Sequence, residues 1–192
     1  NSVATYYNKM SKGKFIVKGA NETSGIVNDG IITVNLDIEH PNFTVENPDY
    51  DSMESYSMFE TIMTATDNYI DYSLYDMNGD TIVDSTELIV TVIAAGHEES
   101  PYRDFAEKAV SGVQIQEPYY VEIDGMYMNS YLITGELMAQ YEGDESMATI
   151  GVVVHEFGHS LRLPDLYDTD YSSEGLGFHA LMASGSNVYS YE

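Results

Sequence analysis

The chain has 192 residues, 43% of them apolar, so one domain with a real core is the first expectation. Seven basic residues against 32 acidic ones give a formal net charge of −25, which argues against nucleic acid or an anionic membrane as a partner. The absence of cysteine excludes disulfides and thiolate ligands, and no apolar run reaches the length of a membrane span. The excess of carboxylates favours bound cations, with solubility outside a cell as the simpler explanation.

The first fifty residues combine short periodic stretches with turns. Ser2–Met10 has apolar and aromatic residues at helical spacing, and Gly13 ends that pattern. KFIVKG, residues 14–19, and IITVNLDI, residues 31–38, predict two strands, the second with one buried face. Residues 40–50 contain two prolines and predict a loop. With neither an initiating Met nor a signal peptide, we expect a processed chain or a fragment of a longer secreted protein.

A long amphipathic helix is predicted from Asp51 to about Tyr72. Asp51 followed three residues later by Glu54 is a suitable helix start. One stripe of residues at helical spacing indicates core packing rather than a cofactor site. The stripe comprises Tyr56, Phe59, Ile62, Met63, Thr66, Tyr69 and Ile70.

Residues 76–87, DMNGDTIVDSTE, carry oxygen ligands at alternate positions, as an EF-hand calcium loop does. Thr81 stands where an EF-hand has glycine, and the following LIVTVIAAG predicts a strand instead of a helix. We therefore expect a structural Ca²⁺ site that leads into a strand, with a solvated acidic turn as the alternative. Its expected ligands are Asp76, Asn78, Asp80, the carbonyl of Ile82, Asp84 and Glu87.

The middle of the chain predicts a buried strand and a hairpin. Residues 88–95 are apolar and β-rich, and His97 and Glu98 are expected in a surface loop after that strand. Residues 100–117 predict irregular structure with one helical turn at 105–110. Asp124-Gly125 separates two alternating runs, which is a strong hairpin signal.

The main chemical signal is IGVVVHEFGHSLRLPD, residues 150–165. His155 and His159 are four residues apart, so on a helix both imidazoles reach one ion. Glu156 lies about 100° further round, near enough to contact a metal-bound water but not an obvious third ligand. Neutral imidazoles for the ion and a carboxylate for the proton suit a hydrolytic zinc site. The other face carries an apolar stripe of Ile150, Val154, Phe157 and Leu161.

A third ligand is expected just after this helix. Pro164 cannot continue the helix, so the chain must turn within a few residues of His159. Asp165 then lies where a returning chain can offer a carboxylate to the same ion. Two histidines, one aspartate and a water make up the open zinc site of a hydrolytic enzyme. His179 is a rival third ligand, whereas Glu174 is disfavoured because no helix places it.

HEFGHSLRLPDLYD, followed by GLGFHALMASGS, resembles the immune inhibitor A type of secreted bacterial metalloprotease. The likeness is strong over the last forty residues and looser over residues 5–19, 71–96 and 120–137. It implies an α/β (α+β) zincin-like catalytic domain over residues 1–192, with a mixed twisted sheet, a backing helix and an active-site helix. The residues matching the family are His155, His159 and Asp165 as zinc ligands, Glu156 as general base and Met182 in a methionine turn beneath the metal.

The resemblance implies a secreted bacterial zinc metalloendopeptidase that uses Zn²⁺ to cleave extracellular proteins or peptides. The charge and the lack of a long apolar run already argue against nucleic acid as a partner and against membrane insertion. Residues 127–133 are the expected edge strand for pairing with extended substrate. Residues 166–177, with Asp168 and Asp170, predict either a second calcium site or a flexible rim. Tyr189 and Tyr191 could supply a phenol to the transition state.

Arg162 departs from the family pattern, which has glycine there. Glycine lets the chain leave the helix through a left-handed conformation. We expect Arg162 to strain this turn by about 1–2 kcal/mol and Asp165 still to reach the ion. The alternative functions are a catalytically impaired zincin-fold module that binds metal or a surface partner, and a calcium-stabilised adhesive domain in which the HExxH motif is vestigial.

Overall fold

The computed structural model describes residues 2–40, 52–98, 109–138, 145–168, 170, 172–173 and 175–187. Most of the predicted loop at 40–50 and of the predicted helical turn at 105–110 therefore lies outside the described residues. The chain divides into two compact units, and the domain prediction of a single unit over 1–192 stays a prediction. Unit 1 is Asn1–Pro41, Pro48–Leu88 and Gln116–Ser130, and unit 2 is Asn42–Asn47, Ile89–Ile115 and Tyr131–Glu192.

Unit 1 begins with the predicted helix, α1 (Val3–Met10), whose N-cap Ser2 accepts a hydrogen bond from the Thr5 N–H at 3.2 Å. The strands predicted at 14–19 and 31–38 are wrong, because neither segment is a β-strand. In 31–36 the side chains alternate between exposed and partly buried, so the pattern did identify one sheltered face. A strand also needs a hydrogen-bonded partner, and hydrophobic alternation carries no information about one.

The predicted long helix is α2 (Ser52–Thr66), with Phe59 and Met63 fully buried. It ends six residues before the predicted Tyr72, which instead begins the 3₁₀ helix η1 (Tyr72–Tyr75). The hydroxyl of the last helical residue, Thr66, lies 3.0 Å from the Ile62 carbonyl and 2.7 Å from the Tyr72 hydroxyl, so it links the end of α2 to the start of η1.

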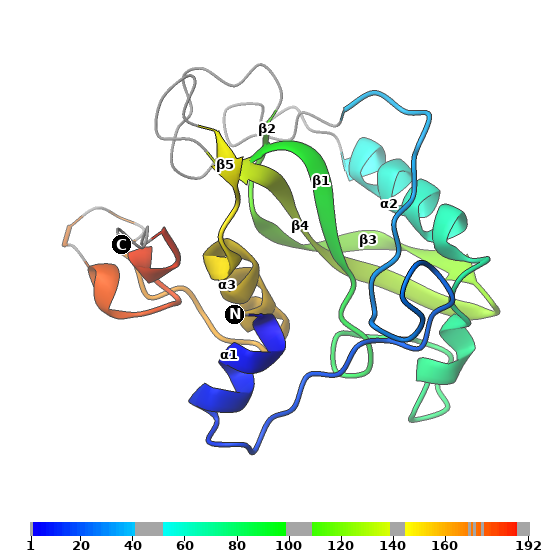
Figure 1. Cartoon of the computed structure of the whole chain (residues 1–192), viewed down its shortest axis with the longest axis horizontal. Helices are drawn as coiled ribbons and strands as arrows, with labels where there is room; N and C mark the ends of the chain where they lie inside the picture. The colour runs from blue at the N-terminus through cyan, green and yellow to red at the C-terminus, as the bar shows by residue number, and fades with distance from the viewer. Residues whose placement is uncertain are drawn as a thin grey trace. The chain divides into compact units, whose positions relative to one another are not determined.

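A five-stranded mixed sheet has the order β2-β1-β4-β3, with β5 also pairing with β4 (Figure 1). β1 runs parallel to both β2 and β4, whereas β5 runs antiparallel to β4. The prediction of a mixed α/β fold is confirmed. The strands are β1 (Thr91–Glu98), β2 (Ala109–Val110), β3 (Val113–Ile123), β4 (Met126–Met138) and β5 (Ser146–Met147).

The predicted hairpin joins β3 and β4. Asp124 and Gly125 have φ of 52° and 73°, the paired left-handed conformations of a two-residue hairpin turn. The expectation that residues 127–133 form a sheet edge is wrong, because β4 lies between β1 and β3. Tyr127 illustrates this within unit 1, since its N–H donates to the Thr81 carbonyl at 2.9 Å and its carbonyl accepts from Val83 at 3.1 Å. β3, and not β4, stands at the end of the strand order.

The strand predicted at 88–95 is displaced towards its C-terminus. β1 includes both His97 and Glu98, and Glu98 is only 3% exposed, so the prediction of a surface loop there is wrong. The register between β1 and β4 shifts after Ala94, and Gly96 lies in the shift with φ of 124°. Glu98 lies on the sheltered side of β1, the same side as Val92 and Ala94.

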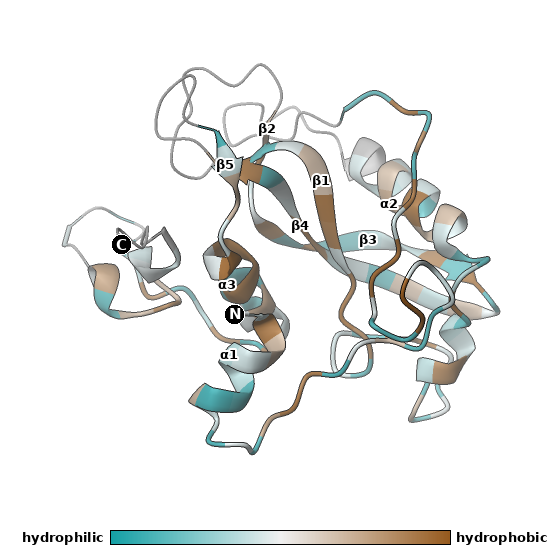
Figure 2. Ribbon diagram, viewed as in Figure 1, coloured by the Kyte–Doolittle hydropathy of each residue, from teal (hydrophilic) through white to brown (hydrophobic). Residues whose placement is uncertain are grey.

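Unit 2 also contains α3 (Ile150–Ser160), capped by the Thr149 hydroxyl. Val154 and Phe157 of the predicted apolar stripe are buried, at 1% and 6% exposure. Figure 2 shows hydrophobic residues concentrated on β1 and α3, whereas β3 is largely hydrophilic. Across the described ranges, no helix is both long and apolar enough to cross a membrane.

Candidate metal centre

The end of α3 is built by a Schellman turn. The Arg162 N–H donates to the His159 carbonyl at 2.7 Å, and the Leu163 N–H donates to the Gly158 carbonyl at 3.0 Å. Arg162 has φ of 65°, so its predicted left-handed conformation is confirmed. A non-glycine residue there costs about 1–2 kcal/mol. The turn nevertheless forms and reverses the chain immediately after His159.

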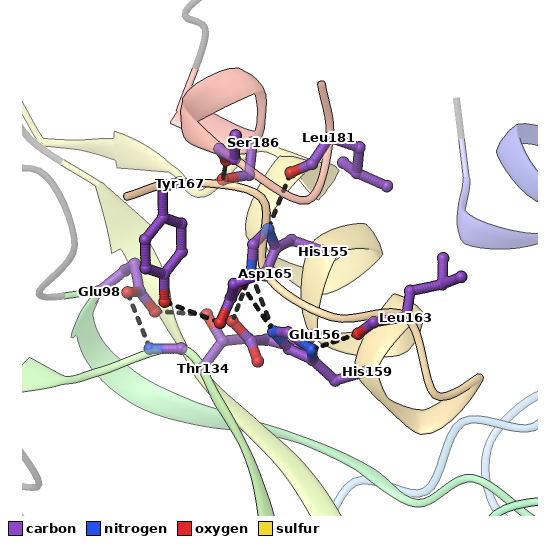
Figure 3. A network of polar contacts seen from close by, with 12 residues as sticks. Glu98, Thr134, His155, Glu156, His159, Leu163, Asp165, Tyr167, Leu181 and Ser186 are labelled. Carbon is purple, nitrogen blue, oxygen red and sulfur yellow. Dashed lines mark hydrogen bonds and ion pairs between the residues drawn. The ribbon is translucent and has the colours of Figure 1, made fainter. Parts of the chain in front are cut away.

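The reversal brings three side chains of unit 2 together. His155 Nε2 and His159 Nε2 are 3.2 Å apart, and Asp165 Oδ1 lies 3.1 Å from the first and 3.2 Å from the second. Figure 3 shows both imidazoles and the carboxylate pointing at one another. Within the described part of the chain, these are the three His, Asp or Glu side chains that could hold one metal ion.

Backbone carbonyls determine which ring nitrogens carry protons. His155 Nδ1 lies 2.8 Å from the Leu181 carbonyl, and His159 Nδ1 lies 2.9 Å from the Leu163 carbonyl. A carbonyl only accepts hydrogen bonds, so each Nδ1 is the donor. In neutral imidazoles both Nε2 atoms then present lone pairs, and these face each other and the Asp165 carboxylate. Three mutually facing acceptors need a cation between them.

The spacing of the donor atoms suits zinc. Tetrahedral zinc with bonds of about 2.0–2.1 Å separates its ligands by about 3.3 Å. The three donor atoms are 3.1–3.2 Å apart. In addition, Asp165 Oδ1 is buried without a hydrogen-bond partner. The two nitrogens and one oxygen therefore fit a catalytic zinc site, in which three protein ligands leave a fourth position open.

Glu156 lies beside this group and not within it. Its Oε1 is 3.9 Å from His155 Nε2, and the residue is only 7% exposed. Burial raises the pKa of the Glu156 carboxyl, an effect that the nearby His155 and His159 partly offset. A carboxylate with a raised pKa at hydrogen-bonding range of a reacting water is suited to proton transfer.

The backbone next to Asp165 is fixed by two hydrogen bonds of Leu166. The Leu166 N–H donates to the Met182 carbonyl at 2.6 Å, and the Leu166 carbonyl accepts from Leu176 at 3.1 Å. The Tyr167 hydroxyl donates to Asp165 Oδ2 at 2.8 Å. Sequence reasoning missed Tyr167. The signal available was its position two residues after Asp165, since alternate residues of a non-helical segment share a side.

Glu98 is a second residue that sequence reasoning missed. Its carboxylate accepts from the Thr134 hydroxyl at 2.5 Å and from the N–H groups of Gly112 and Gly135 at 2.9 and 3.2 Å. An added Cβ at Gly112 would clash with the Val152 side chain of α3. Glu98 thus ties β1 to β4 and to the glycine that packs against the helix bearing His155.

The remaining predicted residues of this region have different outcomes. Met182 is buried, at 5% exposure, and Leu181 before it accepts the hydrogen bond from His155, so the segment lies beside the site. His179 does not belong to the group of three candidate ligands. The Asp168 carboxylate accepts hydrogen bonds from Ser173, Asp170 and Ser172. These bonds lower the pKa of Asp168, and the bond from Ser173 has the largest effect. Outside the described residues lie Glu174, Tyr189 and Tyr191.

The acidic loop of unit 1 is curled around its own carboxylates. Asp76 accepts from the N–H groups of Gly79, Asp80 and Thr81 at 2.8–3.2 Å, and Glu87 reaches back to Met77 at 2.8 Å. Thr81 has φ of 68°, the conformation that glycine supplies at this position of an EF-hand. The carboxylates of this described loop do not form a group comparable to the histidine site.

Comparison with known proteins finds a family whose profile matches nearly the whole chain. The sequence profile described as "Immune inhibitor A peptidase M6, catalytic domain" matches residues 1–190. "Pre-pro-metalloprotease PrtV" of Vibrio cholerae serotype O1 (strain ATCC 39315 / El Tor Inaba N16961) is 49% identical over 41 residues, 20% of this chain and 4% of the relative. "Immune inhibitor A" of Bacillus thuringiensis subsp. alesti is 36% identical over 67 residues, 35% of this chain and 8% of the relative. These matches cover less than a tenth of either relative.

Proposed function

The chain belongs to the immune inhibitor A peptidase M6 family of metallopeptidases, and from this premise we propose that it is a secreted zinc-dependent endopeptidase acting on extracellular proteins. The observation that carries the proposal is the convergence of His155 Nε2, His159 Nε2 and Asp165 Oδ1 within 3.2 Å. The net charge of −25 and the absence of cysteine are compatible with a protein that works outside a cell.

His155, His159 and Asp165 are the proposed zinc ligands. The donor set supports zinc over magnesium or calcium, because two imidazole nitrogens and one carboxylate suit a borderline ion and not a hard one. When bound, zinc supplies Lewis acidity, which lowers the pKa of a water and polarises a carbonyl. The carbonyls of Leu163 and Leu181 hold the imidazoles in the required tautomer.

Glu156 is the proposed general base. Its carboxylate accepts a proton from the attacking water as the water oxygen bonds to the scissile carbonyl carbon. The same carboxyl then donates this proton to the amine nitrogen as the C–N bond breaks. Its raised pKa favours both steps, since the group must take a proton and then hold it long enough to return it.

Calcium is proposed as a second, structural ion in the loop 76–87, with Asp76, Asn78, Asp80, the Ile82 carbonyl, Asp84 and Glu87 as ligands. Two observations support it: the left-handed Thr81 and the return of Glu87 to the start of the loop. On binding the ion, the carboxylate oxygens would exchange part of their bonds to backbone N–H groups for bonds to calcium.

Casein digestion by the purified protein tests the function. The wild type should digest casein, a zinc chelator should stop it, and added zinc should restore it. Glu156→Gln should retain zinc and fold but lose on the order of 10³–10⁴-fold in kcat/KM. Glu122→Gln, an exposed glutamate of β3, is the matched control. Near-wild-type turnover of Glu156→Gln would contradict the assignment, and a zinc-loaded but inactive wild type would favour the impaired zincin-fold module.

A further inference from the structure

We propose that Tyr167 is a positioning residue that keeps Asp165 a one-oxygen ligand of the metal. This inference rests on the proposed zinc site. The phenol donates to Asp165 Oδ2 at 2.8 Å, while Oδ1 is the buried oxygen facing His155 and His159. Figure 3 shows the phenol pointing at this carboxylate. The two oxygens of one side chain therefore have different environments.

The backbone around Tyr167 is held firmly enough to make this contact a property of the fold. Leu166 is bound on its N–H by Met182 and on its carbonyl by Leu176. Gly175 packs directly on this segment, since an added Cβ there would lie 2.7 Å from the Leu166 carbonyl oxygen and 2.9 Å from Tyr167 Cα. The backbone contacts of Leu166 and Gly175 thus fix the positions of both Asp165 and Tyr167.

The hydrogen bond matters because a carboxylate can bind a metal through one oxygen or two. A donor on Oδ2 occupies one of its lone pairs and holds the carboxylate in the orientation that presents Oδ1 to the ion. The fourth coordination position then stays open for water, as a hydrolytic site requires. Without the phenol, Oδ2 is free to move onto the ion and compete with that water.

The experiment replaces Tyr167 by Phe, which keeps the ring and removes only the hydroxyl. Zinc affinity is measured by competition with a chromophoric chelator, and coordination number by the visible absorption spectrum of the Co²⁺-substituted protein. Tyr119→Phe, an exposed tyrosine of unit 1 that is 56% exposed, is the matched control. Circular dichroism checks that each variant is folded.

We expect Tyr167→Phe to bind zinc about 10-fold or more weakly, and its Co²⁺ spectrum to weaken towards that of a higher coordination number. Tyr119→Phe should match the wild type in both measurements. A folded Tyr167→Phe with wild-type affinity and an unchanged Co²⁺ spectrum would overturn the inference alone. A folded wild type that takes up no zinc would overturn the proposed function, and this inference with it.

Discussion

Two regions of the molecule carry metal-ligand patterns, and the structure organises their polar atoms in opposite ways. At the metal centre, the Nδ1 atoms of His155 and His159 donate hydrogen bonds to the carbonyls of Leu181 and Leu163, respectively. The lone pairs of the two Nε2 atoms therefore face one another. In the loop 76–87, the carboxylates accept hydrogen bonds from the loop's own N–H groups. The metal centre therefore has three acceptor atoms facing one another, whereas the carboxylates of the loop 76–87 already accept hydrogen bonds from its backbone.

The difference follows from the backbone beneath each pattern. A helix places residues four apart at a set separation, and a Schellman turn returns the chain at a set point, so three donor atoms are positioned before any ion arrives. A loop has short carboxylates next to many N–H groups, so Asx-type bonds form locally before any ion is present. A pattern of metal ligands in a sequence therefore predicts the positions of the donor atoms best where regular backbone, such as a helix and its terminal turn, carries those residues.

Asp165→Ala should produce the largest change, because it removes one of the three preorganised donors. We expect zinc affinity to fall by more than the roughly 100-fold upper cost of losing an outer contact. Isothermal titration with zinc measures it, and Asp37→Ala, an exposed aspartate of unit 1, is the control. Unchanged affinity in Asp165→Ala would mean that another residue, such as His179, completes the site.

The same rigidity explains how much could be predicted from the sequence. The helix α3, the reversal after it and the Asp124-Gly125 hairpin follow from local signals, namely helical spacing, a proline and a turn dipeptide. Glu98 was misplaced because its burial depends on contacts with Gly112, Thr134 and Gly135, which come later in the chain and leave no signal next to residue 98. The carbonyls of Leu163 and Leu181 leave no mark in a sequence, since every residue has one.

The acidic loop should respond to calcium through stability. If the ion binds, calcium at about 100 times its Kd adds about 2.7 kcal/mol to the free energy of unfolding and raises Tm by several degrees. Asp80→Ala should abolish most of that rise, whereas Asp67→Ala, outside the loop, should keep it. A calcium response that survives Asp80→Ala would place the ion elsewhere.

Arg162→Gly should stabilise the turn after α3 modestly. Glycine removes the left-handed strain of about 1–2 kcal/mol but adds backbone entropy to the unfolded chain, so a net gain of about 1 kcal/mol is expected. Zinc affinity should stay similar or improve slightly, because the turn already forms. Urea unfolding and zinc titration measure the two effects. Conversion of an inert, zinc-poor protein into an active one would instead identify the chain as a crippled relative.

Thr81→Gly makes the corresponding change in the acidic loop, where Thr81 has φ of 68°. The expected stability gain is also about 1 kcal/mol or less, for the same balance of strain and entropy. Calcium affinity should rise, since relief of strain lets the loop adjust around the ion. Calorimetric melting with and without calcium checks it. A loss of calcium response in this variant would show that the loop does not bind in the EF-hand manner.

The most direct measurement of the central claim is the position of zinc in a crystal of the zinc-loaded protein, located by anomalous scattering at the zinc edge. We expect one strong peak bonded to His155 Nε2, His159 Nε2 and Asp165 Oδ1 at about 2.0–2.2 Å, with Glu156 outside the coordination shell. A zinc ion bound by His179 in place of Asp165, or no ion between the two histidines, would contradict it.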